Sequence, residues 1–189
     1  MRTDKGKNRK TAGTNVLLGV TGCIAAYKAA DLASKLAGQG CSVRTILTAS
    51  ACEFVRPKTF EALTGGPVYT SLWAQEQFDI GHISLADWAD IVVQAPATAN
   101  IIGKMAVGVC DDLHSTTLCV CWEKPILIAP AMNTRMWRNP IVQENVKRLK
   151  KLGAAFIGPA SGRLACGDTG EGRMTEPADI LGKIIQLLK

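Results

Sequence analysis

The chain has 189 residues, a formal net charge of +6 and 47% apolar residues. This length suits one domain that buries roughly 70% of the surface its unfolded form would expose, so a disulfide or metal cross-link is not needed for stability. No apolar run approaches the ~20 residues of a membrane span and the N-terminus lacks the apolar core of a signal peptide, so we expect a cytoplasmic protein with no membrane partner.

Most of the positive charge lies in the first 14 residues. Five basic residues there are opposed by Asp4 alone, which leaves only two positive charges for the rest of the chain. A short, polar, basic segment is typical of a disordered tail. We therefore expect a disordered basic leader over residues 1–14, a single folded domain over residues 15–189 and no nucleic-acid partner.

Short apolar runs rich in β-forming residues predict five strands, at residues 16–20, 43–47, 91–95, 125–129 and 154–157. Segments with helical spacing separate these runs. Ile24, Leu32 and Leu36 mark one face of a helix that ends near Gly38.

Two later helices have clear start signals. Asn139-Pro140 and Glu176-Pro177 each place a proline at the first helical position. Because the strands are apolar on both faces, they predict a parallel sheet covered by helices on each side. We predict an α/β fold, a doubly wound Rossmann-like three-layer sandwich with a parallel sheet of about five or six strands.

Cysteine spacing argues against a metal site. The seven cysteines include no CxxC pair and no histidine partner at zinc spacing, so we expect no bound metal and mostly buried thiols. Cys119 and Cys121 flank Val120 in an apolar stretch, which predicts that both pack in the core. His114, in a helical stretch, is predicted to be structural.

Small or polar loops follow the first four predicted strands and lead toward helices. Ligands bind at the carboxyl ends of parallel strands, and the N-termini of helices favour anions such as phosphate. A nucleotide-type cofactor is the expected occupant of these loops. The residues predicted to bind it are Gly22, Cys23, Ile24, Thr48, Ser50, Thr98, Ala99, Asn100 and Ala131.

The first loop is not GxGxxG, and no acidic residue closes the second strand where a dinucleotide enzyme would hold the adenosine ribose. Thr48 and Ser50 offer hydroxyl groups suited to a phosphate instead. These features favour the mononucleotide FMN over NAD without excluding NAD, and the absence of GxxxxGK[ST] argues against a P-loop enzyme.

A glycine-rich segment over residues 159–173 follows the fifth predicted strand. Long loops of this kind are frequently lids over a site, so we expect a mobile loop here. A thiol on an exposed loop is an oxidation liability, which makes Cys166 a candidate catalytic residue.

Several motifs in order resemble those of the homo-oligomeric flavin-containing cysteine decarboxylases, and most closely those of the phosphopantothenoylcysteine decarboxylases. The resemblance covers nearly all of residues 15–180. Thr98 and Ile101 depart from the family's PASANT motif, where serine and threonine stand. The matching segments are residues 21–28, His82 to Leu85, Pro96 to Ile101, Pro130 to Trp137 (the family's PxMNxxMW) and Leu164 to Gly167.

This resemblance implies FMN-dependent decarboxylation of 4'-phosphopantothenoylcysteine to 4'-phosphopantetheine in coenzyme A biosynthesis. Oxidation of the substrate's thiol-bearing carbon would create the electron sink that carbon dioxide loss requires. His82 would be the acid/base residue, Asn133 would bind the substrate carboxylate, and Cys166 would donate a proton. Leu164, Ala165 and Cys166 would form the flap that covers the substrate. The pattern at Asn133 also fits a helix N-cap.

The resemblance further implies a homo-oligomer, a trimer or a tetramer of trimers (a homododecamer). His82 would come from one protomer and Asn133 and Cys166 from its neighbour. A synthetase domain or protein is a possible partner. The alternatives are a peptidyl-cysteine decarboxylase, a non-catalytic regulatory flavoprotein and a flavin prenyltransferase; the intact set of three residues argues against the second.

Overall fold

Six parallel strands form the central sheet, in the order β3-β2-β1-β4-β5-β6. The computed structural model describes residues 11–73, 81–165 and 167–189. The strand order reverses between β1 and β4, where crevices form in sheets of this type. The strands are β1 (Asn15–Val20), β2 (Ser42–Leu47), β3 (Val68–Tyr69), β4 (Ile91–Ala97), β5 (Ile126–Pro130) and β6 (Ala155–Phe156).

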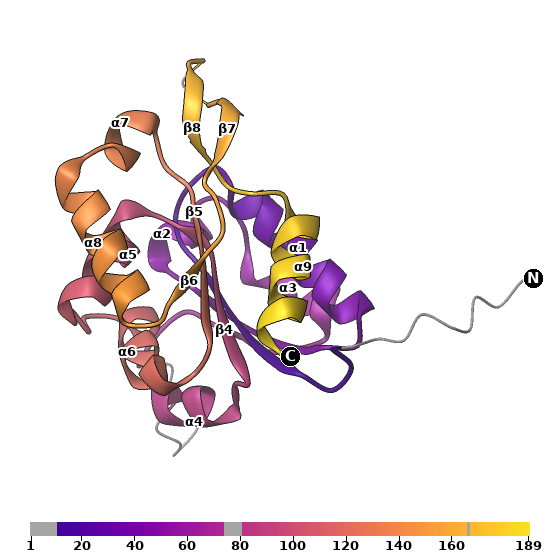
Figure 1. Cartoon of the computed structure of the whole chain (residues 1–189). Helices are drawn as coiled ribbons and strands as arrows, with labels where there is room; N and C mark the ends of the chain where they lie inside the picture. The colour runs from indigo at the N-terminus through magenta and orange to yellow at the C-terminus, as the bar shows by residue number, and fades with distance from the viewer. Residues whose placement is uncertain (1–10, 74–80, 166) are drawn as a thin grey trace, which may run out of the picture.

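Helices cover both faces of this sheet, which confirms the predicted doubly wound three-layer sandwich (Figure 1). One face packs against α1 (Ala26–Gly38), α3 (Pro57–Thr64) and α9 (Pro177–Leu187). The other packs against α4 (Gly81–Trp88), α5 (Ala99–Val107), α6 (Leu113–Val120) and α8 (Pro140–Lys151). Shorter elements are α2 (Ala49–Cys52), α7 (Thr134–Trp137) and η1 (Cys121–Glu123).

Local signals start the helices as expected. The side chain of Asn139 accepts a hydrogen bond from the backbone N–H of Ile141 (2.9 Å), and Pro140 opens α8. Pro177 likewise opens α9. The placement of Ile24 on the buried face of α1 was wrong: the helix begins at Ala26, and Ile24 precedes it with 59% of its surface exposed. The buried face of α1 is formed instead by Ala26, Ala29, Leu32 and Leu36.

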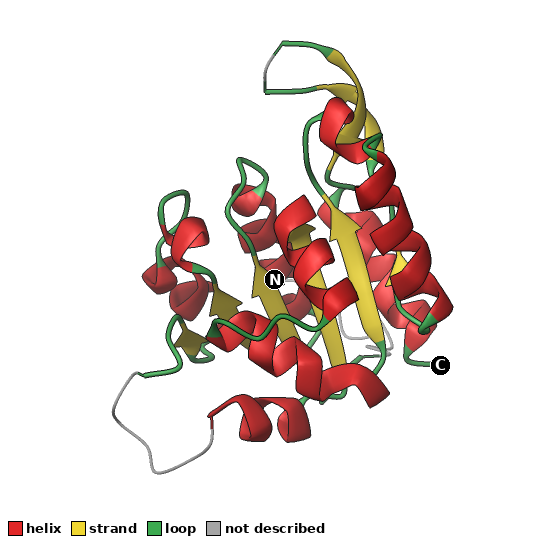
Figure 2. Cartoon of the chain, turned by 90° about the vertical axis from the view of Figure 1, so that its left-hand side faces the viewer, coloured by secondary structure: helices red, strands yellow, loops and turns green. Residues whose placement is uncertain are grey.

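The predicted mobile loop over residues 159–173 is largely an antiparallel hairpin. Its strands are β7 (Ala160–Arg163) and β8 (Thr169–Arg173), which pair from Arg163 and Thr169 at the tip, with a shift of register between Ala160 and Ser161. Figures 1 and 2 show it standing beyond the carboxyl ends of the sheet. The segment lies beside a cavity, where a lid was expected, but most of it has regular structure.

Residues 11–14 of the predicted leader pack onto the domain. Thr11 is 1% exposed, Gly13 N–H donates to the carbonyl of Gly40 (3.0 Å), and Ser42 N–H donates to that of Thr14 (2.9 Å). Residues 1–10, which hold the basic cluster, lie outside the described residues.

The two neighbouring cysteines differ in their surroundings. Cys121 is buried as predicted, and burial raises its thiol pKa to about 11. Cys119 is exposed, so its predicted place in the core was wrong: successive helical residues point about 100° apart, and α6 turns Cys119 outward. Among the described residues there is neither a helix with the length and apolarity of a membrane span nor a group of three metal-ligating side chains.

Candidate active site

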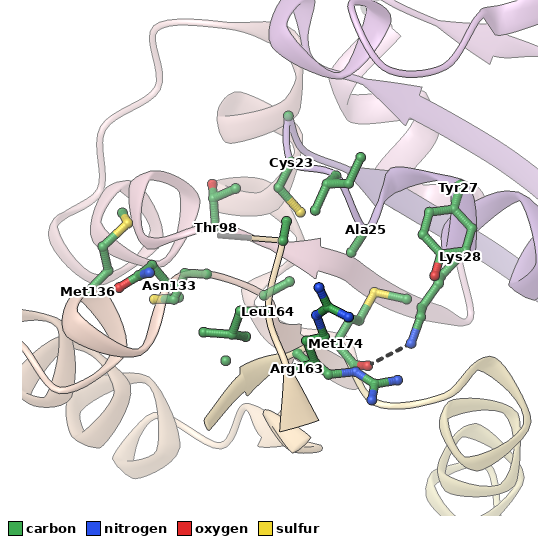
Figure 3. A pocket seen from close by; sticks show the side chains of 17 residues that line it. Cys23, Ala25, Tyr27, Lys28, Thr98, Asn133, Met136, Arg163, Leu164 and Met174 are labelled. Carbon is green, nitrogen blue, oxygen red and sulfur yellow. Dashed lines mark hydrogen bonds between the residues drawn. The ribbon is translucent and has the colours of Figure 1, made fainter. Parts of the chain in front are cut away.

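A cavity of about 520 Å³ opens at the carboxyl ends of β1, β4 and β5, beneath the hairpin (Figure 3). This is the crevice at which the strand order reverses. Its volume lies within the range of small-molecule sites. The lining residues come from the loop after β1 (Gly22 to Ala25), α1 (Tyr27, Lys28), Thr98, the loop after β5 and α7 (Ala131, Met132, Asn133, Met136), the hairpin (Arg163, Leu164, Ala165, Gly172, Arg173) and Met174.

The loop after β1 is held by Thr21. Its hydroxyl donates to the carbonyl of Pro96 (2.7 Å) and accepts from the N–H of Thr98 (3.2 Å), which joins the ends of β1 and β4. Gly22 lies against Ser50, and a Cβ at Gly22 would clash with it. The loops after β1, β2 and β4 therefore converge at one point.

Cys23 lines this part of the cavity. Burial raises the pKa of its thiol, and a backbone hydrogen bond from Ala25 lowers it to a smaller extent. The thiol is therefore protonated at neutral pH and contributes an apolar surface rather than a nucleophile.

The loop after β4 leads into α5. The Thr98 hydroxyl caps this helix by accepting from Ile101 N–H (3.5 Å), and Thr98 also lines the cavity. The side chain of Ile101 is 2% exposed and packs in the core. The threonine that the family places at this position is thus replaced by an apolar core residue.

Asn133 caps α7 and lines the cavity. Its side-chain oxygen accepts from the N–H of Arg135 (2.8 Å), in agreement with the N-cap interpretation. Figure 3 shows its amide beside Met136 at one end of the cavity. Capping fixes the plane of the amide, so its polar atoms are held in place without the cost of ordering a free side chain.

Backbone contacts dock the hairpin on the loop after β5. Met132 N–H donates to the carbonyl of Gly172 (3.0 Å), and a Cβ at Gly172 would clash with the Met132 carbonyl. Gly170 leaves equally little room beside Thr134. Close approach of two backbones requires glycine at position 172, and the contact with the Thr134 side chain requires it at position 170. Leu164 and Ala165 are thereby brought to the cavity, while Cys166 between β7 and β8 lies outside the described residues.

A charged cluster, which the sequence analysis did not predict, closes the side of the cavity beside α1. The Lys28 amine contacts a carboxylate oxygen of Glu176 (2.6 Å) and the carbonyl of Met174 (3.3 Å), and the Arg173 guanidinium contacts the same carboxylate (2.9 Å). The hydrogen bond from Lys28 is the largest cause of a lowered Glu176 pKa; desolvation opposes it, and the charges of Lys28 and Arg173 reinforce it. Of the three charged residues in this cluster, only Lys28 belongs to a segment that matches the family motifs, residues 21–28.

Not every predicted site residue lines the cavity. Gly22, Cys23, Ile24, Thr98, Ala131, Asn133, Leu164 and Ala165 do so. Ala99 and Asn100 form the first turn of α5, and Thr48 and Ser50 lie at the start of α2, where the Thr48 hydroxyl accepts from Ala51 N–H (3.1 Å). His82 is in α4, at the opposite end of the molecule from the hairpin (Figures 1 and 2). One chain therefore does not bring His82 to its own cavity.

Curated relatives of this chain include two-function enzymes. It is 49% identical over 168 residues to the coenzyme A biosynthesis bifunctional protein CoaBC of Bacillus subtilis (strain 168), a match that covers 88% of this chain and 41% of the relative. It is 46% identical to CoaBC of Vibrio vulnificus (strain YJ016), over 90% of this chain and 42% of the relative. The chain thus spans about two fifths of the length of these relatives.

Solved structures match over nearly the whole chain. A PPC decarboxylase mutant complexed with pantothenoylaminoethenethiol is 35% identical with a TM-score of 0.85, covering 91% of this chain and 96% of the other. The FMN binding protein AtHal3 is 35% identical with a TM-score of 0.78, covering 90% and 94%. The family model described as Flavoprotein matches residues 4–189. The chain therefore belongs to the Flavoprotein family.

Proposed function

We propose that this chain catalyses the FMN-dependent decarboxylation of 4'-phosphopantothenoylcysteine to 4'-phosphopantetheine, a step of coenzyme A biosynthesis. One observation carries the proposal: the match to the PPC decarboxylase mutant extends over 91% of this chain and 96% of the other. The cavity at the strand ends adds a site of suitable size in this chain. The CoaBC relatives support the same substrate.

The residues of the cavity fit a flavin mononucleotide. The loop after β1 lies against the loop after β2 at Gly22 and Ser50 and is bonded to the loop after β4 through Thr21 and Thr98. Both neighbouring loops lead into the first turns of helices, and such groups favour a phosphate. Cys23, Ile24, Ala131 and Met132 supply the apolar surface that a flat ring system requires. When bound, FMN supplies a reversible two-electron acceptor for the thiol-bearing carbon of the substrate.

The side chains of this chain would orient the substrate and move protons. The capped amide of Asn133 would hold the carboxylate that is lost, since its plane is fixed by the bond to Arg135. Leu164 and Ala165 would exclude water from the cavity. Cys166 would donate the proton that completes the product.

His82 requires a second protomer in this proposal. It lies far from the cavity of its own chain, at the N-terminal end of α4. We propose a homotrimer, alone or as a tetramer of trimers, in which His82 reaches the cavity of a neighbour and serves as its acid/base residue. A synthetase, fused or separate, would supply the substrate.

A peptidyl-cysteine decarboxylase is the second candidate, because the FMN-dependent cysteine decarboxylase SpaF is 31% identical with a TM-score of 0.81. The cavity wall favours the first candidate: Lys28, Arg163 and Arg173 all line it. Lys28 and Arg173 share the single carboxylate of Glu176, so the three cations leave an excess of positive charge beside the cavity. That excess suits a compact anionic substrate such as a phosphate ester better than a peptide chain.

The test is to reconstitute the purified chain with FMN, record its absorption spectrum, and measure carbon dioxide release from 4'-phosphopantothenoylcysteine and from a peptide with a C-terminal cysteine. We expect a yellow protein that releases carbon dioxide from the first substrate and forms 4'-phosphopantetheine. The matched variant Cys166→Ser should bind FMN and fail to form that product. Failure to take up FMN, or turnover of the peptide alone, would overturn the proposal.

A further inference from the structure

A series of buried hydrogen bonds leads from α6 to the wall of the cavity. His114 Nε2 lies 2.6 Å from the Gln94 side-chain oxygen, and Gln94 Nε2 donates to the carbonyl of Pro96 (3.1 Å). The same carbonyl accepts from the Thr21 hydroxyl (2.7 Å), which in turn accepts from Thr98 N–H (3.2 Å). Thr98 lines the cavity. Hydrogen bonds among five residues thus connect α6 to the candidate site.

The direction of each bond follows from chemistry. The carbonyl of Pro96 can only accept, so the Gln94 amide must present its nitrogen there and its oxygen to His114. His114 Nε2 must then carry a proton and donate it. The imidazole is neutral, with Nδ1 unprotonated, buried and without a hydrogen-bond partner among the described residues.

This pair fills a space that admits little else. His114 is 2% exposed and Gln94 is fully buried. A Cβ at Gly19 would clash with both His114 Nε2 and the Gln94 oxygen, so β1 runs directly against the pair. Two buried polar side chains that satisfy each other stabilise a fold no more than apolar ones of the same shape. What apolar side chains could not provide is the donor that reaches Pro96.

We propose that His114 and Gln94 are positioning residues for the flavin site, acting through the carbonyl of Pro96 on Thr21 and the backbone of Thr98. The Gln94 amide holds the end of β4, and His114 fixes the orientation of that amide. Together they set the gap between the loops after β1 and β4, into which the cofactor is proposed to bind. This inference rests on the proposed flavin site.

The test compares four variants of the full chain. His114→Leu removes the donor to Gln94, and His114→Gln replaces it by an amide that can donate at the same place. The double variant Gln94→Leu/His114→Leu removes both partners and with them the bond to Pro96. Thr117→Val is the matched control: it deletes a buried hydrogen bond of the same helix, from Thr117 to the carbonyl of Leu113 (2.7 Å), which does not lead to the cavity.

Two quantities are measured for each variant: the FMN dissociation constant, from flavin fluorescence, and the melting temperature of the protein without FMN. We expect His114→Leu to raise the dissociation constant about tenfold, the effect of one buried hydrogen bond. His114→Gln should stay close to wild type. The double variant should recover the melting temperature yet keep the weakened FMN binding, and Thr117→Val should lower the melting temperature alone.

The opposite pattern would overturn the inference. If FMN affinity follows the melting temperature across all four variants, or if His114→Leu binds FMN as tightly as wild type, the pair is merely structural. A wild-type chain that binds no FMN would instead refute the proposed function, and this inference with it. Failure of the inference alone is therefore recognised by tight binding in both wild type and His114→Leu.

Discussion

The Thr134 hydroxyl donates a 2.6 Å hydrogen bond to the backbone carbonyl of Glu171, which ties the first residue of α7 to the middle of β8. Thr134 follows Asn133, so one turn of chain both orients the candidate carboxylate ligand and anchors the hairpin. The position of the hairpin over the cavity is thereby coupled to that of Asn133. Because the hydrogen bond that anchors the hairpin comes from Thr134, a substitution there can weaken the anchor while leaving Asn133 in place.

Replacing Thr134 by valine should loosen the hairpin without unfolding the domain. The variant keeps the shape of the side chain but loses one partly exposed hydrogen bond, a cost of about 1 kcal/mol. We expect the KM for 4'-phosphopantothenoylcysteine to rise several-fold while FMN affinity is unchanged, as measured by steady-state kinetics and flavin fluorescence. Thr64→Val is the control: away from the cavity it removes a hydroxyl that donates to the carbonyl of Phe60 and accepts from Gly66 N–H. Equal effects in both variants would contradict a role in anchoring.

Gly172→Ala should disrupt the docking of the hairpin. An added Cβ would meet the carbonyl of Met132, and the backbone at Gly172 has a φ of +149°, which disfavours alanine. We expect at least a tenfold loss of kcat/KM, with retained secondary structure by circular dichroism. Gly182→Ala in α9 has nothing within 4 Å of the added Cβ and should keep full activity with a slightly higher melting temperature. Normal activity of Gly172→Ala would show that the hairpin need not dock closely.

Stability should fall in mild acid because of His114. Burial lowers its pKa from 6.5 to about 4; the charge of Asp112 opposes this with a smaller upward contribution, and the charge of Lys104 adds a smaller downward one. The unfolded chain takes up a proton on this side chain below pH 6.5 whereas the folded chain does not, so the contribution to stability is present above pH 6.5 and declines toward pH 4. The loss is on the order of 3 kcal/mol.

Urea unfolding at pH 7 and pH 4.5 measures this effect. His114→Gln, which carries no titrating group, should lose less free energy of unfolding between the two pH values than wild type. The other acid-sensitive groups cancel in this difference. An identical pH dependence in the two proteins would exclude a buried neutral His114.

Mixed oligomers can test where His82 acts. His82→Asn and Cys166→Ser should each be inactive in product formation when prepared alone. Co-expression should restore activity, because random assembly of trimers pairs an intact His82 with an intact Cys166 at about one site in four overall, and at about one site in three in the trimers that contain both variants. Two differently tagged chains, purified in sequence, isolate the mixed oligomers. If these remain inactive, His82 and Cys166 do not act across a subunit boundary.

The order of strands and helices could be predicted because it depends on local signals. Continuous apolar runs mark strands buried on both faces. Helix starts are marked by the fixed φ of Pro140 and Pro177, and at Asn139 also by its cap hydrogen bond. β3 was missed since two residues leave too short an apolar pattern to detect. The loops that line the cavity follow from the same reasoning, because parallel strands bring their carboxyl ends to one edge.

The hairpin was decided by tertiary structure. Residues 159–173 are rich in glycine, which disfavours strands, yet they pair because Gly170 and Gly172 allow close contact with the loop after β5. The same holds for the contacts of Lys28 with Glu176 and of Gln94 with His114, whose partners are distant in sequence or lie on different elements. The sequence by itself determined the fold class and the motifs that surround the cavity. Only the tertiary structure decided which side chains meet there, because those pairings depend on packing between elements that no local pattern records.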